Sequence, residues 1–92
     1  MKSIIQTEDD KCFLCHMAYG TDTHHIFGGP NRKLSEADGL KIRVCRACHT
    51  EIHEGKHSGE LQKTLHQLGQ LKWEDKYGSH EEFMKRYGRS WL

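Results

Sequence analysis

The sequence predicts a small α+β domain in which bound metal takes the place of much of the hydrophobic core, with helices at its C-terminal end. The chain has 92 residues, of which 35% are hydrophobic, and domains this small usually need a metal or disulfides to fold stably. Cysteines and histidines gather between residues 12 and 53, among strand and turn signals, whereas residues 58–92 show helical periodicity. We therefore expect one domain, 1–92, with a metal-stapled core at 12–54 and a helical extension at 58–92.

The first ten residues read as a loose or strand-like lead, in which Ile4 and Ile5 are the apolar pair available to anchor it. The lead lacks the apolar stretch of a signal peptide. No window of the chain approaches the roughly 18 apolar residues that a membrane span needs. We expect an intracellular protein with reduced cysteines and no membrane partner.

The four cysteines form two C-x-x-C pairs about thirty residues apart, a spacing typical of zinc knuckles rather than of a disulfide framework. Four thiolates complete a tetrahedral Zn²⁺ site with no open position, so the expected zinc is structural and not catalytic. His16 follows the first pair directly and is not expected to be a ligand, because the site is already full. The predicted ligands are Cys12, Cys15, Cys45 and Cys48.

Two short strands are expected on either side of a polar loop. Thr21–Phe27 is β-leaning and would carry the pair His24 and His25 on or beside a strand, where adjacent side chains face opposite sides. The run Gly-Gly-Pro-Asn breaks regular structure, so we expect a loop over 28–39. Residues 40–44 alternate apolar and basic side chains, the pattern of a half-buried strand.

Three helices are expected after the second strand. Residues 46–54 contain neither Gly nor Pro and place His49 and His53 on one helical face, about a turn apart, where both can bind one ion. Gly55 is the predicted C-cap. The next helix is predicted to start at an N-cap, Ser58, and to end near Gly78, with a buried stripe made by Leu61, Leu65, Leu68 and Trp73.

Within that helix, Gly69 weakens the prediction by about 1 kcal/mol relative to Ala. The last helix is predicted from a capping box, Ser79-x-x-Glu82. Phe83 and Tyr87 would lie on one face of it, and Gly88 would end it. We expect the apolar stripes of both helices to form core rather than a partner surface.

The four histidines of the central region together indicate a second, catalytic metal site. Three neutral imidazoles leave open coordination positions on a divalent ion, which a catalytic metal requires and a structural metal avoids. A fourth, uncoordinated imidazole can take a proton from water near neutral pH. The histidines are His24, His25, His49 and His53.

This order of motifs resembles the HNH (ββα-metal) endonucleases. It comprises a two-histidine strand, a polar loop, a second strand and an H-x-x-x-H helix that starts at C-x-x-C. The two knuckles are similar to those of the zinc-stapled phage and bacterial branch, and the resemblance covers roughly residues 12–53. It implies that His24 binds the catalytic ion with His49 and His53, and that His25 is the general base that activates water. It also implies hydrolysis of phosphodiester bonds to 5′-phosphate and 3′-hydroxyl ends, by a cytoplasmic protein encoded by a bacterium or a phage.

The sequence departs from the family at one position. The side chain of the family's central Asn pins the loop between the strands by hydrogen bonds to the backbone. By this spacing the Asn would fall near Leu40, whose side chain cannot make such bonds. Asp38 is close enough to substitute, and Asn31 lies in the same loop.

The resemblance implies nucleic acid as the partner, with DNA as the expected substrate and RNA as the alternative. The net charge of +1 neither announces nor excludes such a partner. The expected cofactors are the structural Zn²⁺ and a second divalent ion such as Mg²⁺, Mn²⁺, Ni²⁺ or Zn²⁺. The sequence leaves the oligomeric state and the cleavage specificity open. Candidate contacts to the flanking phosphates are Arg32, Lys33, Arg43 and Arg46.

The main rival interpretation is a non-catalytic, zinc-stapled module that binds nucleic acid or a protein. The missing Asn favours this rival. Four histidines at nuclease spacing count against it, because a pure binding module does not need them. A zinc-dependent deaminase would have Glu in an H-x-E pattern, and neither His24 nor His25 is followed by one.

Overall fold

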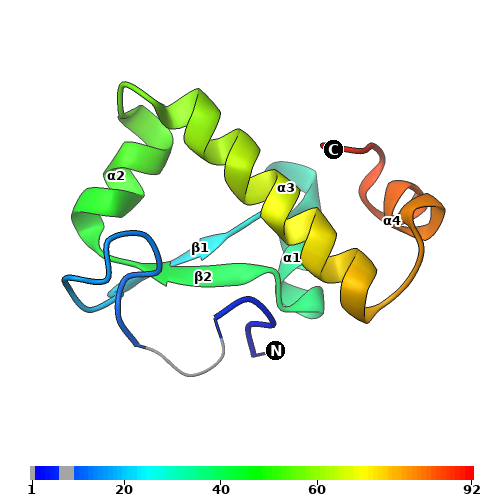
Figure 1. Ribbon diagram of the computed structural model, residues 1–92, viewed down its shortest axis with the longest axis horizontal. Helices are drawn as coiled ribbons and strands as arrows, with labels where there is room; N and C mark the ends of the chain where they lie inside the picture. Colours follow the sequence, from blue (N-terminus) through cyan, green and yellow to red (C-terminus); the bar gives the residue numbers. More distant parts are fainter. Residues whose placement is uncertain (1, 7–9) are drawn as a thin grey trace.

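The computed structural model describes residues 2–6 and 10–92, and it places a two-stranded antiparallel sheet among helices (Figure 1). This architecture confirms the predicted α+β class. The remainder of the N-terminal lead, residues 1 and 7–9, lies outside the described residues. The elements follow the order β1 (Asp22–His25), the 3₁₀ turn η1 (Gly29–Asn31), α1 (Arg32–Asp38), β2 (Lys41–Val44), α2 (Arg46–Glu54), α3 (Ser58–Lys76) and α4 (His80–Tyr87).

The sheet joins the two strands that the sequence predicts. In its register His24 lies opposite Ile42, and His25 lies opposite Lys41. The alternation of the second strand is confirmed, because Ile42 and Val44 are buried while Arg43 is exposed. One face of the sheet therefore packs into the core. α3 approaches the segment that follows β1, where Gly69 lies close to Ile26.

The prediction of a loop over 28–39 is wrong, because this segment folds into η1 and α1. Pro30 lies in the first turn of η1, where its missing N–H would have no helical partner in any case. Gly39 ends α1 in the left-handed conformation, with φ 74°. Leu34 is the only large apolar residue of α1, and it packs against the core. With a single such residue the segment has no helical periodicity to read.

A buried serine fixes the connection between the strands. The hydroxyl of Ser35 donates to the Leu40 carbonyl at 2.5 Å and accepts from the Phe27 N–H at 3.2 Å. The Leu40 N–H donates back to the Ser35 carbonyl at 2.8 Å. Ser35 therefore makes the backbone hydrogen bonds for which Asp38 and Asn31 were the candidates.

Asp38 and Asn31 instead attach the C-terminal helices. The Asp38 carboxylate accepts from Trp73 Nε1 at 2.9 Å, from Arg86 Nε at 2.6 Å and from the Tyr87 hydroxyl at 2.7 Å. Asn31 Nδ2 donates to the Tyr87 carbonyl at 3.2 Å. One carboxylate on α1 thus binds side chains from both α3 and α4, so the extension packs onto the core.

The two C-terminal helices form as predicted except at one end. His57 occupies the N-cap of α3 and Ser58 is its first residue, with no side-chain cap, which corrects the predicted N-cap. The Ser58 N–H donates to the Gly55 carbonyl at 3.1 Å, so the turn before the helix already uses this donor. The capping box of α4 is confirmed, because Ser79 and Glu82 each accept a hydrogen bond from the other's N–H.

The core lies between the sheet, α2 and the C-terminal helices. Gly69 permits the close approach of α3 to the segment that follows β1, because a Cβ there would lie 2.6 Å from Ile26 Cγ2. The predicted stripes are core in most positions: Leu65, Trp73, Phe83 and Tyr87 are buried. Leu61 packs against the core, whereas Leu68 is only partly buried and lies outside the core cluster. The other buried apolar residues come from the strands and the segments beside them, from α2 and from the cysteine turn: Ile26, Phe27, Leu40, Ile42, Val44, Ile52 and Cys12.

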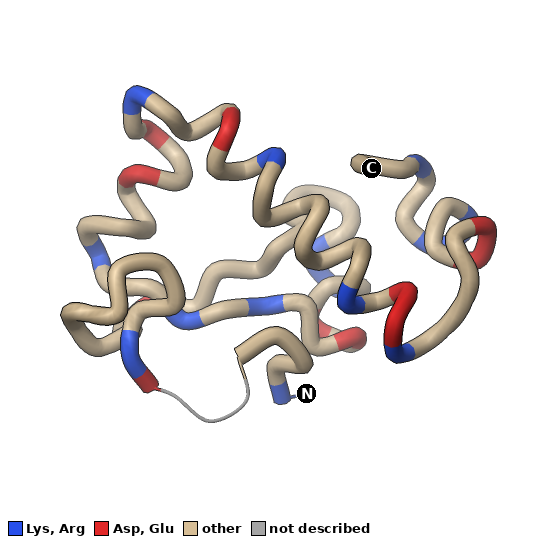
Figure 2. The backbone as a smooth tube through the Cα atoms, in the orientation of Figure 1, with Lys and Arg blue, Asp and Glu red and all other residues tan. Residues whose placement is uncertain are grey.

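Charges are mixed along the chain. Figure 2 shows acidic and basic residues following one another through the helices. On β2 the basic residues are Lys41 and Arg43. None of the helices in the described residues is long and apolar enough to cross a membrane.

Candidate metal centres

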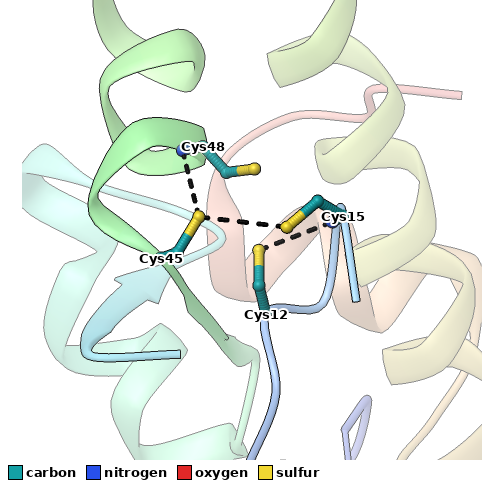
Figure 3. A group of neighbouring side chains, drawn as sticks. All are labelled: Cys12, Cys15, Cys45 and Cys48. Carbon is teal, nitrogen blue, oxygen red and sulfur yellow. Dashed lines mark hydrogen bonds between the residues drawn. The ribbon is translucent and has the colours of Figure 1, made fainter. Parts of the chain in front are cut away.

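The four cysteines come from two separate segments that the fold brings together (Figure 3). Cys12 and Cys15 lie in a tight turn, in which the Cys15 N–H donates to Cys12 Sγ at 3.5 Å. Cys45 is the N-cap of α2, and its Sγ accepts from the Cys48 N–H at 3.5 Å. Phe13 fastens the turn to β2, since its N–H donates to a β2 carbonyl at 2.8 Å.

The spacing of the sulfur atoms suits a tetrahedral ion. All four Sγ atoms lie within 4.8 Å of one another, and Cys15 Sγ is 4.0 Å from Cys45 Sγ. A tetrahedron with Zn–S bonds of about 2.3 Å places its sulfurs about 3.8 Å apart. All four cysteines are described and none forms a disulfide, so the cluster could hold a structural zinc ion.

The thiols of the cluster ionise unequally without an ion. Burial opposes ionisation of Cys12, but N–H donors led by that of Cys15 outweigh it and lower the Cys12 pKa to about 6. Burial and the neighbouring sulfurs raise the pKa of Cys48. One negative charge forms readily, and further thiolates in the same space need a cation to neutralise them. Because zinc binds thiolates, the donor set fits zinc.

A second group of potential ligands joins β1 to α2. The ring centroid of His24 lies 5.6 Å from that of His49 and 5.4 Å from that of His53. The two α2 rings are 4.9 Å apart. One ring nitrogen from each of the three lies within 4.8 Å of the others, so the group could hold a metal ion. We call it the histidine triad.

Asp22 forms a hydrogen bond with His49, one of the three residues of the triad. Its Oδ2 lies 2.9 Å from His49 Nδ1 and 3.3 Å from Arg46 Nε. The hydrogen bond from His49 lowers the pKa of the Asp22 carboxyl, against a smaller opposing effect of burial. An ionised carboxylate only accepts hydrogen bonds, so His49 carries its proton on Nδ1 and Nε2 remains for an ion. Metal-binding histidines in proteins almost always donate their other ring N–H to a carboxylate, a backbone carbonyl or a water molecule, and Asp22 would be such a partner.

The interior position of His24 favours its neutral form. Burial lowers the pKa of His24 to about 4, and the neighbouring rings of His53 and His49 act in the same direction. A neutral imidazole is the form that binds a metal. The environment of His24 therefore suits a ligand near neutral pH.

His25 lies beside the triad but contacts a different element. Its Nε2 lies 3.0 Å from Glu36 Oε1 on α1, and Lys41 Nζ lies 2.6 Å from the other oxygen of that carboxylate. Adjacent positions of β1 thus meet different partners: His24 meets α2, and His25 meets α1.

Two hollows border His25. The first has a volume of about 330 Å³. Its lining includes the three triad residues, His25, Arg32 and His66 of α3. The ring of His66 stacks on Phe27, with centroids 5.3 Å apart. The second hollow, of about 540 Å³, lies over α1 and shares His25 and Arg32 with the first. We call them the triad hollow and the α1 hollow.

The four candidate phosphate contacts separate into two pairs. Arg32 lines both hollows and Lys33 lines the α1 hollow. Arg43 Nε donates to the Gly20 carbonyl at 2.9 Å, and neither hollow includes it. Arg46 lies against Asp22, behind the triad. Arg32 and Lys33 are therefore the two candidates that border His25.

Three residues at these sites were missed by sequence reasoning. Asp22 had a readable signal, because it lies two positions before His24 and so shares its face of the strand. Glu36 and His66 had none, since they reach the site from helices that are distant in the sequence.

No family model matches the chain, and comparisons with curated proteins and with solved structures also found no match.

Proposed function

We propose that this protein is a metal-dependent endonuclease of the HNH (ββα-metal) type, which hydrolyses phosphodiester bonds and has DNA as its expected substrate. One observation carries the proposal: His24, His49 and His53 converge on a hollow that His25 also lines. The cysteine cluster at the start of α2 supports it, because a structural zinc there would hold the helix that supplies two of the three ligands.

The chain's residues divide the chemistry between them. His24, His49 and His53 would hold the divalent ion, which when bound stabilises negative charge developing on the phosphoryl oxygens. His25 takes a proton from water, which then attacks phosphorus in line with the leaving oxygen. Arg32 and Lys33, which line the α1 hollow with His25, would bind a phosphate beside the reacting one.

The test is cleavage of supercoiled plasmid by zinc-loaded protein with Mg²⁺, Mn²⁺, Ni²⁺ or added Zn²⁺. His25→Ala should slow cleavage by about 10² to 10⁴, the usual contribution of a positioned general base, while both metal sites still fill. His49→Ala should weaken binding of the second ion, measured by titration calorimetry. His57→Ala is the matched control, because this exposed histidine lines neither hollow.

Two results would count against the proposal. A His25→Ala protein that cut at the wild-type rate would remove the assigned base. Wild-type protein that bound DNA but stayed inert with every ion would instead support the non-catalytic binding module.

A further inference from the structure

A carboxylate from α1 bridges the proposed base and a lysine. Glu36 Oε1 lies 3.0 Å from His25 Nε2, and Glu36 Oε2 lies 2.6 Å from Lys41 Nζ. The His25 side chain is only 11% exposed. A ring packed this closely has little freedom to change partners, so the contact with Glu36 defines its orientation.

The charge state of Glu36 decides which nitrogen of His25 carries the proton. Hydrogen bonds from Lys41 and His25 lower the pKa of Glu36 to about 2, although burial opposes them. Near neutral pH the carboxylate is ionised and can only accept hydrogen bonds. His25 must then donate from Nε2, and Nδ1 is left without a proton in the neutral ring.

The two hollows help to show on which side of His25 its ring nitrogens lie. His25 lines both hollows, whereas Glu36 lines the α1 hollow and not the triad hollow. The Nε2 end is thus held on the α1 side. Nδ1 is the other ring nitrogen, and His25 also lines the triad hollow, where the candidate metal ligands lie.

We propose that Glu36 is a positioning residue, which holds His25 as the Nε2–H tautomer so that Nδ1 takes the proton from the attacking water. This inference rests on the proposed function. In the step, a water O–H bond breaks and its proton moves to Nδ1, while the water oxygen forms a bond to phosphorus. The bond from phosphorus to the 3′-oxygen breaks, and that oxygen leaves with the electron pair and takes a proton from solvent. The resulting imidazolium keeps its hydrogen bond to the Glu36 carboxylate, which stabilises it.

The first test reads the tautomer and needs no activity. Long-range ¹⁵N–¹H spectra of zinc-loaded wild-type protein should show His25 protonated on Nε2 alone. In Glu36→Ala, which removes the acceptor, a second population protonated on Nδ1 should appear. A wild-type ring protonated on Nδ1, or a tautomer unchanged by Glu36→Ala, would overturn the inference.

The second test separates positioning from a merely structural role. Glu36→Gln should lower kcat by about 10- to 100-fold with little change in KM, the range typical when a residue supporting an active-site histidine is lost. Lys41→Met is the matched control, because it breaks the pairing of α1 with β2 but leaves the contact of Glu36 with His25. It should change kcat by less than about threefold. Equal losses of kcat in Glu36→Gln and Lys41→Met would show that Glu36 acts only through its ion pair with Lys41.

A double variant completes the design. If Glu36 acts through His25, Glu36→Gln should cost nothing further in a His25→Ala background. Active wild-type protein with an equally active Glu36→Gln variant would overturn the inference and leave the proposed function standing. Inert wild-type protein would overturn the proposed function, and the tautomer spectra would still decide whether Glu36 positions His25.

Discussion

The carboxylate of Asp22 should affect how tightly the proposed second metal site binds its ion. Asp22→Asn removes the charge that holds His49 protonated on Nδ1, so the ring can turn or change tautomer. We expect the second ion, tested with Mn²⁺ or Ni²⁺ by titration calorimetry, to bind about 10- to 100-fold more weakly. Zinc content should not change.

A matched control for this variant is Asp75→Asn, an exposed residue of α3. It should bind the second ion as the wild type does. Equal affinities in Asp22→Asn and the wild type would mean that the carboxylate does not support His49.

His24 should make stability fall in mild acid. Its pKa is about 4 in the fold and about 6.5 in the unfolded chain. Between these values the unfolded state binds more protons, so the free energy of unfolding decreases as pH falls from 6.5 to 4. After allowance for solvent screening, we expect a loss of about 1 kcal/mol between pH 7.5 and 5.5.

Urea unfolding of wild-type protein and of His24→Gln, without added second ion, measures this effect. Any acid loss from the cysteine cluster is common to both proteins, so their difference isolates His24. The same dependence on pH in both would contradict the prediction.

At the scale of an element, the position of α3 depends on Gly69, which has no side chain to keep the helix away from Ile26. Gly69→Ala would place a Cβ 2.6 Å from Ile26 Cγ2 and 3.3 Å from Phe27 Cε2. The added Cβ should push α3 away from Ile26 and Phe27 and lower the free energy of unfolding by about 1 to 3 kcal/mol. This loss exceeds the gain of up to about 1 kcal/mol from the higher helix propensity of Ala. Thermal or urea unfolding of the zinc-loaded protein would measure the loss.

Gly59→Ala is the control within the same helix. Nothing lies within 4 Å of the Cβ that it would add, so we expect no loss and a gain of up to about 1 kcal/mol. A Gly69→Ala protein as stable as Gly59→Ala would show that α3 can shift without penalty.

For the whole molecule, one helix links the two candidate metal sites. Cys45 is the N-cap of α2, and the nine residues of the helix include Cys48, His49 and His53. Removing zinc with a chelator should therefore unfold the protein and abolish the second site as well. The physical reason is that the free energy of zinc binding is as large as the stability of the fold. Structural zinc contributes roughly 10 to 16 kcal/mol of apparent binding energy, and a typical domain has a net stability of about 5 to 15 kcal/mol.

Element analysis and circular dichroism before and after chelation are the measurements. Native protein should contain one tightly held zinc, and Cys45→Ser should lose it. A zinc-free protein with native secondary structure and an unchanged thermal midpoint would contradict the prediction.

Local patterns in the sequence were enough for the elements that local chemistry specifies. The bounds of α2 follow from a stretch without Gly or Pro, and the start of α4 follows from reciprocal hydrogen bonds across four residues. The alternation of β2 and the C-x-x-C pairs are likewise short-range patterns. The cysteine cluster and the histidine triad were therefore predictable as sets of residues.

Tertiary structure decided what depends on contacts between distant segments. α1 has little apolar periodicity, and its place comes from the bonds of Ser35 and the contacts of Asp38 with the C-terminal helices. Glu36 reaches His25 only because α1 packs beside β1. Hydrogen bonds act over about 3 Å, so the partners of His25 and His49 appear only once the chain has folded. The residue types and spacing of the candidate metal sites were thus determined by the sequence. The groups that orient their side chains were determined by the packing of α1, α2 and α3 with the strands.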